Sequence, residues 1–332
     1  MTGSRPGRLE SAVARAIRGD PRRIVITGSG GWLGMATLEL LHSALGEQLS
    51  GRVACFGSRQ RILRLTDGTE VEQRPLKQIA DLPAQPSFVL HLAFLTKDRA
   101  EAMDEAPYRE ANRALSQSVL EALDRIGAEA LFVASSGAAA FADDPEASDA
   151  MRLYGMLKRE DEDQFAAWAE TTRRQAVIAR IFNLSGPHIN KHQSYALASF
   201  ILDAHAGRPI AIRATRPVIR GYVAIRELMS LVFAIMLEGK AGVTRFDTGG
   251  VPMEMQAIAE AVGGQVGNAA VERPEITSDK ADRYVGDEAT YAALLSRYGI
   301  EPVSFAQQVA ETADFIANFH ASSASRRVAL GK

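Results

Sequence analysis

Short apolar runs alternate with longer amphipathic stretches through the first half of the chain. The runs are rich in β-branched and aromatic residues, and they predict buried strands at 23–27, 52–56, 88–94, 130–136 and 176–182. Between them, apolar residues recur every three or four positions, which predicts helices at 33–45, 108–126 and 154–170. This alternation is typical of a doubly wound parallel sheet with helices on both faces, so we predict an α/β fold.

After about residue 185 the alternation of strands and helices becomes irregular, with mixed helices and short strands. This indicates a smaller lobe packed over the carboxyl edge of the sheet. The apolar stretch at 228–237 is about half as long as a bilayer-spanning helix, so we expect a core helix and no membrane partner. The predicted parts are an N-terminal extension at 1–22, the sheet domain at 23–184, a mainly substrate-binding lobe at 185–320 that partly returns to the core, and a flexible tail at 321–332.

Charge and cysteine content narrow the classes of partner and compartment. The formal net charge is −2 and the chain has no basic field, so we expect no nucleic-acid partner. The single cysteine, Cys55, lies in the apolar stretch "VACF" and is expected to be a buried strand residue rather than a reactive thiol. Without a segment that resembles a signal peptide, a cytoplasmic protein is the expectation.

The segment "VITGSGGWLG" places a glycine-rich turn between the first strand and the first helix of the sheet. Gly28 permits a tight turn, Gly31 lets the backbone approach a pyrophosphate, and Gly34 allows the helix to pack closely on the strand. Such turns also serve structure alone. At this place in an alternating pattern the turn predicts a Rossmann-type dinucleotide site that includes Trp32 and Leu33, because a helix N-terminus offers free N–H donors to phosphates.

The turn after the second strand bears on which dinucleotide binds. A site for NAD usually has an acidic residue there, whereas "GSRQR" has none. Ser58 and Arg59 suit a 2′-phosphate, because a guanidinium binds phosphate as a carboxylate does not. We therefore predict NADP in preference to NAD. The alternative is that Arg59 and Arg61 are solvated surface charges.

Tyr154 and Lys158 stand four residues apart on the predicted helix 154–170 and so share a face. A phenol with a pKa near ~10 is a poor base at neutral pH, and a neighbouring cation stabilises its phenolate. Tyr154 is thus predicted to exchange a proton with a substrate while a nicotinamide exchanges hydride. A Tyr and a Lys four residues apart are common on helices. The pair becomes specific for this chemistry because it follows the glycine turn and the strand "LFVASSGA".

Six ordered segments resemble the extended short-chain dehydrogenases/reductases of the NAD-dependent epimerase/dehydratase family, which mostly modify nucleotide sugars. The similarity runs from about residue 22 to 318, and the six segments are "TGSGGWLG", "HLAF", "PYREANRAL", "YGMLKRE", "ARIFNLSGPHI" and "IRGYVAIREL". The resemblance implies that Tyr154 is the acid/base, Lys158 its modulator and a ribose ligand, and Ser136 the hydroxyl that bonds the reacting oxygen. It implies cofactor contacts at Leu92 and Ala93 and substrate contacts at Ser135, Asn183 and Arg220.

One departure from the family pattern narrows the reaction. Family 4,6-dehydratases follow the Ser or Thr with an Asp-Glu pair, whereas Gly137 and Ala138 follow Ser136 here. We therefore predict an NAD(P)-dependent oxidoreductase that transfers hydride at a carbon of a nucleotide-linked sugar, with 4-keto reduction preferred. The alternative is a nucleotide-sugar epimerase with tightly bound NAD. A non-catalytic protein that binds NADP(H) as a redox sensor is less favoured, because Tyr154 and Lys158 are both present.

Other features receive structural interpretations. His91 is expected to be a packed or cofactor-adjacent imidazole, and the run "REDED" at 159–163 the solvated face of its helix. His188 and His192 have no obvious carboxylate partner, so no metal site is predicted. The apolar faces of helices 108–126 and 154–170 suggest a homodimer formed through a four-helix bundle.

Overall fold

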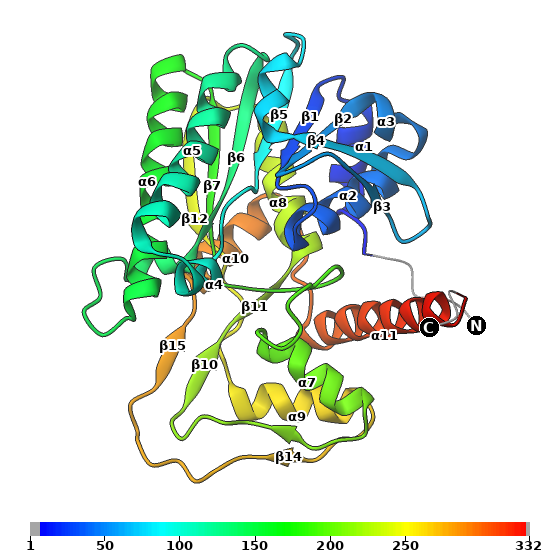
Figure 1. Cartoon of the computed structure of the whole chain (residues 1–332), viewed down its shortest axis with the longest axis vertical. Helices are drawn as coiled ribbons and strands as arrows, with labels where there is room; N and C mark the ends of the chain where they lie inside the picture. Colours follow the sequence, from blue (N-terminus) through cyan, green and yellow to red (C-terminus); the bar gives the residue numbers. More distant parts are fainter. Residues whose placement is uncertain (1–6, 330–332) are drawn as a thin grey trace.

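The computed structural model describes residues 7–329, with side chains through residue 319, and its main sheet has the strand order β12-β7-β6-β5-β1-β2-β4-β3 (Figure 1). The strands are β1 Arg23–Thr27, β2 Val53–Gly57, β3 Arg61–Arg64, β4 Glu70–Pro75, β5 Ser87–His91, β6 Ala128–Ser136, β7 Gln175–Ile181 and β12 Gly242–Asp247. All neighbours pair in parallel except β3, which runs antiparallel to β4. The predicted doubly wound α/β fold is confirmed.

Helices cover both faces of this sheet (Figure 1). One layer contains α2 (Trp32–Leu45) and α8 (Ile225–Glu238), and α8 is the buried core helix expected at 228–237. The other contains α5 (Glu105–Leu123) and α6 (Asp149–Thr172). The remaining short helices are α3 Leu49–Arg52, α4 Lys97–Ala102, α10 Glu288–Arg297, η1 Gly46–Gln48, η2 Leu76–Asp81 and η3 Gly137–Phe141.

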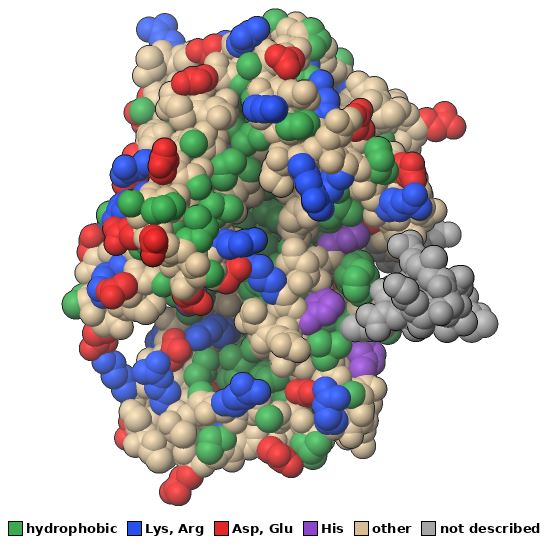
Figure 2. Space-filling model, in the orientation of Figure 1, with side chains coloured by type: hydrophobic (Ala, Val, Ile, Leu, Met, Phe, Trp, Pro, Cys, Tyr) green, Lys and Arg blue, Asp and Glu red, His purple; other side chains and the backbone are tan. Residues whose placement is uncertain are grey.

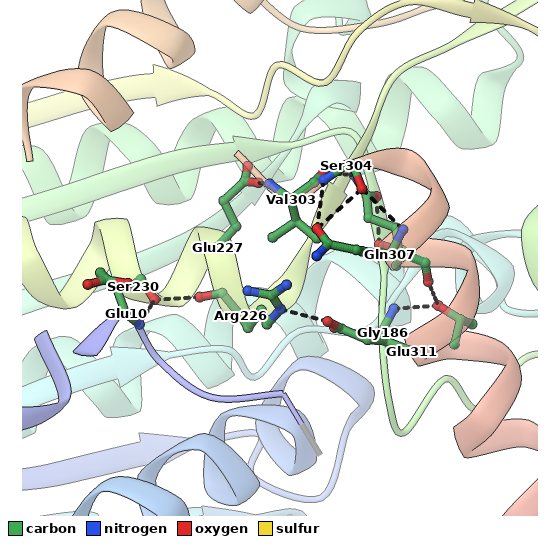
Figure 3. Close-up of polar contacts among 12 residues, drawn as sticks. Glu10, Gly186, Arg226, Glu227, Ser230, Val303, Ser304, Gln307 and Glu311 are labelled. Carbon is green, nitrogen blue, oxygen red and sulfur yellow. Dashed lines mark hydrogen bonds and ion pairs between the residues drawn. The ribbon is translucent and has the colours of Figure 1, made fainter. Parts of the chain in front are cut away.

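The predicted N-terminal extension contains a packed helix, α1 (Ser11–Gly19), whose side chains at Val13 and Ile17 are buried against α2 and α8. Just before it, the amide of Glu10 donates to Ser230 Oγ on α8 at 2.9 Å (Figure 3). The extension therefore covers one end of the sheet domain.

The smaller lobe lies beyond the carboxyl ends of the strands and has its own apolar core (Figure 1). Its elements are β8 Asn183–Ser185, α7 Ala196–His205, β9 Ile210–Ala211, β10 Val218–Arg220, β11 Tyr222–Ala224, β13 Met253–Glu254, α9 Met255–Gln265, β14 Val271–Glu272, β15 Asp282–Tyr284 and α11 Phe305–Ala329. Strand β12 joins the main sheet, and helices α8 and α10 contact its strands.

Helix α11 joins the two parts. The Arg226 guanidinium on α8 donates to Glu311 Oε1 on α11 at 2.8 Å, and Glu227 beside it accepts the amide of Val303 (Figure 3). The helix continues to Ala329, beyond the start at 321 that we predicted for a flexible tail, and residues 330–332 lie outside the described part of the chain.

The packing corrects the expectation of a solvated face for the run at 159–163, and it also shows what the apolar faces of α5 and α6 contact. Asp161 and Glu162, expected on a solvated face, are only 3% and 2% exposed because that part of α6 packs on the sheet and on α5. The apolar residues of α5 and α6 face the sheet, and an Arg113–Glu160 ion pair of 2.9 Å lies on their outer side. The apolar faces that suggested a homodimer are therefore already used within the chain.

Candidate functional site

The glycine turn fits closely against a second turn, the one that follows β5. Gly28 has a φ of +71°, and a Cβ placed there would lie 2.7 Å from the amide nitrogen of Ala93. A Cβ on Gly34 would lie 2.4 Å from the carbonyl oxygen of Gly28. These contacts fit the roles predicted for Gly28 and Gly34, since a side chain at Gly28 would push the two turns apart and one at Gly34 would clash with the backbone of the glycine turn itself.

The turn after β5 is tied to the end of β1 through Thr27. The amides of Leu92 and Ala93 both donate to Thr27 Oγ1, at 3.2 and 3.3 Å. Thr27 Oγ1 also lies 3.0 Å from Nδ1 of His91. The His91 side chain is 2% exposed, and its ring is tilted by 50° against that of Phe165, with centres 4.8 Å apart. His91 is thus the packed imidazole beside the predicted cofactor site that we expected.

The first residues of α2 direct their side chains away from the turn. The Trp32 indole donates to the carbonyl of Pro187 at 2.9 Å, and Leu33 packs against the sheet core. Gly31 is the N-cap and provides no side-chain acceptor for the first amides of the helix. The glycine turn and these free N–H groups fit the pyrophosphate of a dinucleotide, so Gly31, Trp32 and Leu33 would contribute backbone donors.

The end of β2 carries no carboxylate at the predicted ribose position. Ser58 and Arg59 are exposed there. Gln73 of β4 donates to the Arg59 carbonyl at 2.8 Å and accepts from Ser29 Oγ at 3.1 Å. Arg61, left as a surface charge by the alternative interpretation, lies over the glycine turn: a Cβ on Gly30 would be 1.4 Å from its Nη2. The β3–β4 register, which opposes Arg61 to Gln73, places it there.

Phe94, in the turn after β5, contacts both residues that are predicted to perform acid/base chemistry. The Lys158 ammonium donates to the Ala134 carbonyl at 2.8 Å and lies 3.8 Å from the centre of the Phe94 ring. The Phe94 and Tyr154 rings meet edge to face, with centres 5.7 Å apart. Phe94 was not predicted, because its role depends on the fold that brings β5 beside α6.

Burial shifts the pKa values of both residues. It lowers the pKa of Lys158 to about 8, although the carboxylates of Asp161 and Glu162 oppose the shift. It raises the pKa of Tyr154 above that of a free phenol, with Tyr284 adding to the effect and a hydrogen bond with Ser136 opposing it. At neutral pH the Tyr154 side chain is therefore a neutral phenol, the form that can donate a proton.

Ser136 meets an aromatic residue from the smaller lobe. Its hydroxyl accepts the amide of Ala138 at 3.2 Å and lies 3.4 Å from the Tyr284 hydroxyl. The Tyr284 ring lies between Phe141 and Phe182, with ring centres 5.6 and 4.8 Å away. Tyr284 is 148 positions away in sequence and was missed because no local pattern links it to Ser136. Figure 2 shows this face of the molecule hollowed between the sheet domain and the smaller lobe.

The three residues predicted to contact substrate are all engaged within the protein. The Asn183 amide donates to the carbonyls of Gly221 and Tyr284, each at 3.1 Å. The Arg220 guanidinium forms an ion pair with Asp282 at 3.2 Å. The Ser135 hydroxyl is buried and donates to Glu162 Oε1 at 2.5 Å. Alternate residues of a strand point to opposite faces, so Ser135 is not brought to the side that Ser136 occupies.

Comparisons with solved structures show the same fold over most of the chain. A UDP-N-acetylglucosamine 4-epimerase of Methanobrevibacter ruminantium, in complex with UDP-N-acetylmuramic acid, is 17% identical, with a TM-score of 0.68 over 89% of this chain and 98% of that chain. UDP-glucose 4-epimerase of Thermotoga maritima with UDP-glucose is 16% identical, with a TM-score of 0.66 over 90% of this chain and 99% of that one. UDP-glucose 4-epimerase of Thermus thermophilus with NAD is 21% identical, with a TM-score of 0.63 over 88% and 98%.

At the level of sequence, no curated protein matches the chain significantly. In the described part of the chain, no helix is both long and apolar enough to cross a membrane. The family model described as "NAD dependent epimerase/dehydratase family" matches residues 24–247, a segment that contains the glycine turn, Ser136, Tyr154, Lys158 and Arg220. The chain therefore belongs to the NAD-dependent epimerase/dehydratase family.

Proposed function

We propose that this protein is an NAD(P)-dependent oxidoreductase that acts on a carbon of a nucleotide-linked sugar, with reduction of a 4-keto group as the preferred reaction. The observation that supports the proposal is that Ser136 ends β6 and that Lys158, one turn after Tyr154 on α6, donates to Ala134 of β6, so that these residues lie toward the same carboxyl edge of the sheet as the glycine turn after β1. Ligands in open α/β sheets bind at that edge. A bound nicotinamide supplies or accepts hydride.

The residues of the chain provide the proton and the orientation. Tyr154, held as a neutral phenol by burial, donates its proton to the ketone oxygen as that oxygen gains negative charge. The Ser136 hydroxyl holds the same oxygen in place and stabilises the developing charge. The Lys158 ammonium, fixed by the Ala134 carbonyl and the Phe94 ring, stabilises the phenolate that remains.

NADP is the proposed cofactor. Arg59 lies in the turn after β2 and Arg61 begins β3, and this turn contains no acidic residue. Guanidinium groups bind phosphate well. NADP favours a reductase, which releases oxidised cofactor after each turnover. The Thermus thermophilus epimerase was solved with NAD, so the alternative is an epimerase that retains NAD through its cycle.

A nucleotide sugar is the proposed substrate class. The Methanobrevibacter and Thermotoga structures hold UDP-linked sugars, and their fold matches this chain through the smaller lobe. Arg220 at the end of β10 would bind the diphosphate bidentately after releasing its present partner, Asp282.

The test is catalysis by the purified protein with nucleotide sugars and their 4-keto forms. We expect consumption of added NADPH, with little activity when NADH replaces it. Protein that instead retains stoichiometric NAD and interconverts two epimers without added cofactor supports the alternative and overturns the reductase. Tyr154→Phe should lose about 10²- to 10⁴-fold in kcat while still binding dinucleotide. Tyr298→Phe is the matched control, because that hydroxyl bonds Glu238 on the surface far from β6.

Two further proposals concern assembly and location. We propose a homodimer through α5 and α6, joined by polar contacts because their apolar faces are used within the chain. A monomer mass at micromolar concentration in light scattering would refute it. We also propose a cytoplasmic location, supported by the unpaired Cys55 thiol, whose pKa burial raises to about 12. Cell fractionation with an antibody against the chain tests this location.

A further inference from the structure

Two adjacent carboxylates lie buried behind Lys158, and only one of them has a cationic partner. Glu162 pairs with the Arg180 guanidinium at 2.7 Å and also accepts the Ser135 hydroxyl. Asp161 Oδ1 accepts the Ser116 hydroxyl at 2.5 Å, while Asp161 Oδ2 has no hydrogen-bond partner among the described residues. The charge of Glu162 is therefore compensated by Arg180, and that of Asp161 is not.

The hydrogen bonds around Thr27 fix which nitrogen of His91 faces Asp161. Thr27 Oγ1 accepts two amide protons, from Leu92 and Ala93, so its own proton is directed to His91 Nδ1 at 3.0 Å. With Nδ1 as acceptor, the proton of the neutral imidazole is on Nε2. His91 Nε2 lies 3.8 Å from Asp161 Oδ2, and it too has no other partner in the described structure. In this tautomer the Nε2–H group of His91 points toward Asp161.

Lys158 is the buried cation on which the Asp161 charge acts. The two residues are three positions apart on α6 and so share a face, and both are at most 5% exposed. The elements packed around α6 bring no other buried Lys or Arg side chain to Asp161 among the described residues. Their charged or titratable groups near this region are Arg180, engaged by Glu162; Arg109 and Arg113, paired with Glu105 and Glu160; Arg245, paired with Asp163; Asp247; His91; and Lys97, Asp98, Arg99 and Glu101 of the surface helix α4.

We propose that Asp161 is a positioning residue whose buried, uncompensated carboxylate keeps the Lys158 side chain in its ammonium form at neutral pH. The proposal rests on the proposed function in one respect, namely that the Lys158 charge supports Tyr154. Burial alone disfavours an ammonium, and the carboxylates of Asp161 and Glu162 both oppose that effect. Glu162 shares its charge with Arg180, whereas Asp161 has no such ion pair with Lys or Arg in the described part of the chain. Of the two, Asp161 supplies the larger opposing effect.

The decisive experiment measures the Lys158 titration directly. Protein labelled with ¹³C at lysine Cε is titrated by NMR, and the Lys158 signal is assigned by its loss in Lys158→Arg. In Asp161→Asn the Lys158 midpoint should fall by about 1 pH unit, because the nearby opposite charge is lost. Asp163→Asn makes the same change two residues further along α6, where the side chain is exposed, and should leave the midpoint unchanged. A Lys158 midpoint equal to wild type in Asp161→Asn overturns the proposal.

Further variants separate charge from shape. Asp161→Glu retains the charge and should keep the Lys158 midpoint near that of wild type, whereas a midpoint as low as in Asp161→Asn contradicts the proposal. Asp161→Ser, with a smaller side chain, provides the same test if the Asn variant does not fold. Thermal unfolding checks each variant.

Enzyme assays connect the titration to function. If the enzyme is active, the alkaline limb of kcat/KM should move to lower pH by the same amount in Asp161→Asn, and a limb that stays in place contradicts a role through Lys158. A protein without oxidoreductase activity would overturn the proposed function, yet the NMR titration would still decide the role of Asp161.

Discussion

The two halves of the candidate site differ in how their functional groups are engaged. On the sheet side, the first amides of α2 have no side-chain cap, and Arg59 is exposed. On the lobe side, the Arg220 guanidinium already bonds Asp282 and two backbone carbonyls. If these halves bind dinucleotide and substrate as proposed, we expect the first to need little rearrangement and the second to exchange internal bonds for bonds to the substrate.

This difference has an energetic consequence. Hydrogen bonds to charged groups contribute about 1.5–3 kcal/mol each, so a substrate that displaces Asp282 from Arg220 gains only the difference between two such interactions. A cofactor phosphate at the N-terminus of α2 replaces water rather than a protein carboxylate. We expect the affinity for the dinucleotide not to depend on Arg220. The affinity for the substrate should depend on the balance between Arg220 and Asp282.

The largest effect is expected from Arg220→Ala. Losing a charge-assisted contact to the diphosphate should raise KM for the nucleotide sugar by about 10- to 100-fold. The dissociation constant of the dinucleotide, measured by fluorescence titration, should stay as in wild type. Equal weakening of both ligands would show that the two halves are not independent.

Asp282→Asn sharpens the same comparison from the other side. The neutral amide no longer holds Arg220 by charge, so KM should fall below the wild-type value, by about 3- to 10-fold if half of such an interaction is recovered. Asp279→Asn, an exposed carboxylate in the same segment, is the control. A raised KM in Asp282→Asn would mean that Asp282 holds Arg220 in its binding position rather than competing for it.

An effect of similar size is expected at the turn from β2 to β3. Arg61→Ala and Arg59→Ala should each weaken NADPH by about 5- to 10-fold relative to NADH, because exposed charge-assisted contacts are partly screened by solvent. Arg64→Ala is the control, since Arg64 lies on the same strand as Arg61 and pairs with Glu70 at 2.8 Å. A loss confined to Arg61→Ala would transfer the predicted 2′-phosphate contact from Arg59 to Arg61.

The sequence predicted those strands and turns whose patterns are local. β1, β5 and β7 are apolar runs buried on both faces, as expected for the middle of a parallel sheet. β3 and β4 read "RILR" and "EVEQRP", and they escaped prediction because strands near the sheet edge expose charged residues to water. β12, "GVTRFD", escaped for the same reason at the opposite edge.

For the site, the residues whose roles depend on nearby sequence could be predicted, and those whose roles depend on tertiary contacts could not. Gly28 and Gly34 could be identified because their roles depend on backbone geometry within a few residues. Asp161 could not, because a run of charges on a helix is normally solvated, and only the packing of α5 and β5 on α6 buries this one. Tyr284 reaches Ser136 from the smaller lobe, and the Ser135 hydroxyl is taken by Glu162 on α6.

An effect on stability rather than on affinity is expected at Glu39, where α2 of the sheet side meets the loop that leads into the lobe. Its carboxylate accepts both the amide and the hydroxyl of Thr66 and bonds His188 Nε2 at 3.1 Å. Burial alone would raise the pKa of Glu39, but these hydrogen bonds outweigh it and hold the pKa below the ordinary value of 4.5. Glu39→Gln should therefore lower the free energy of unfolding at pH 7 by about 1–2 kcal/mol.

The pH dependence distinguishes the carboxylate from mere packing at this contact. A carboxyl with a depressed pKa stabilises the folded state above pH 4.5, the ordinary value, and this stability is lost as pH falls through the lower folded value. The difference between wild type and Glu39→Gln should thus be constant near neutrality and shrink below pH 4.5 in urea unfolding. Glu47→Gln, an exposed carboxylate just beyond the end of α2, should show no such difference. A Glu39 difference that persists unchanged into acid would assign its effect to the shape of the side chain, and the junction between the two halves would then depend on packing rather than charge.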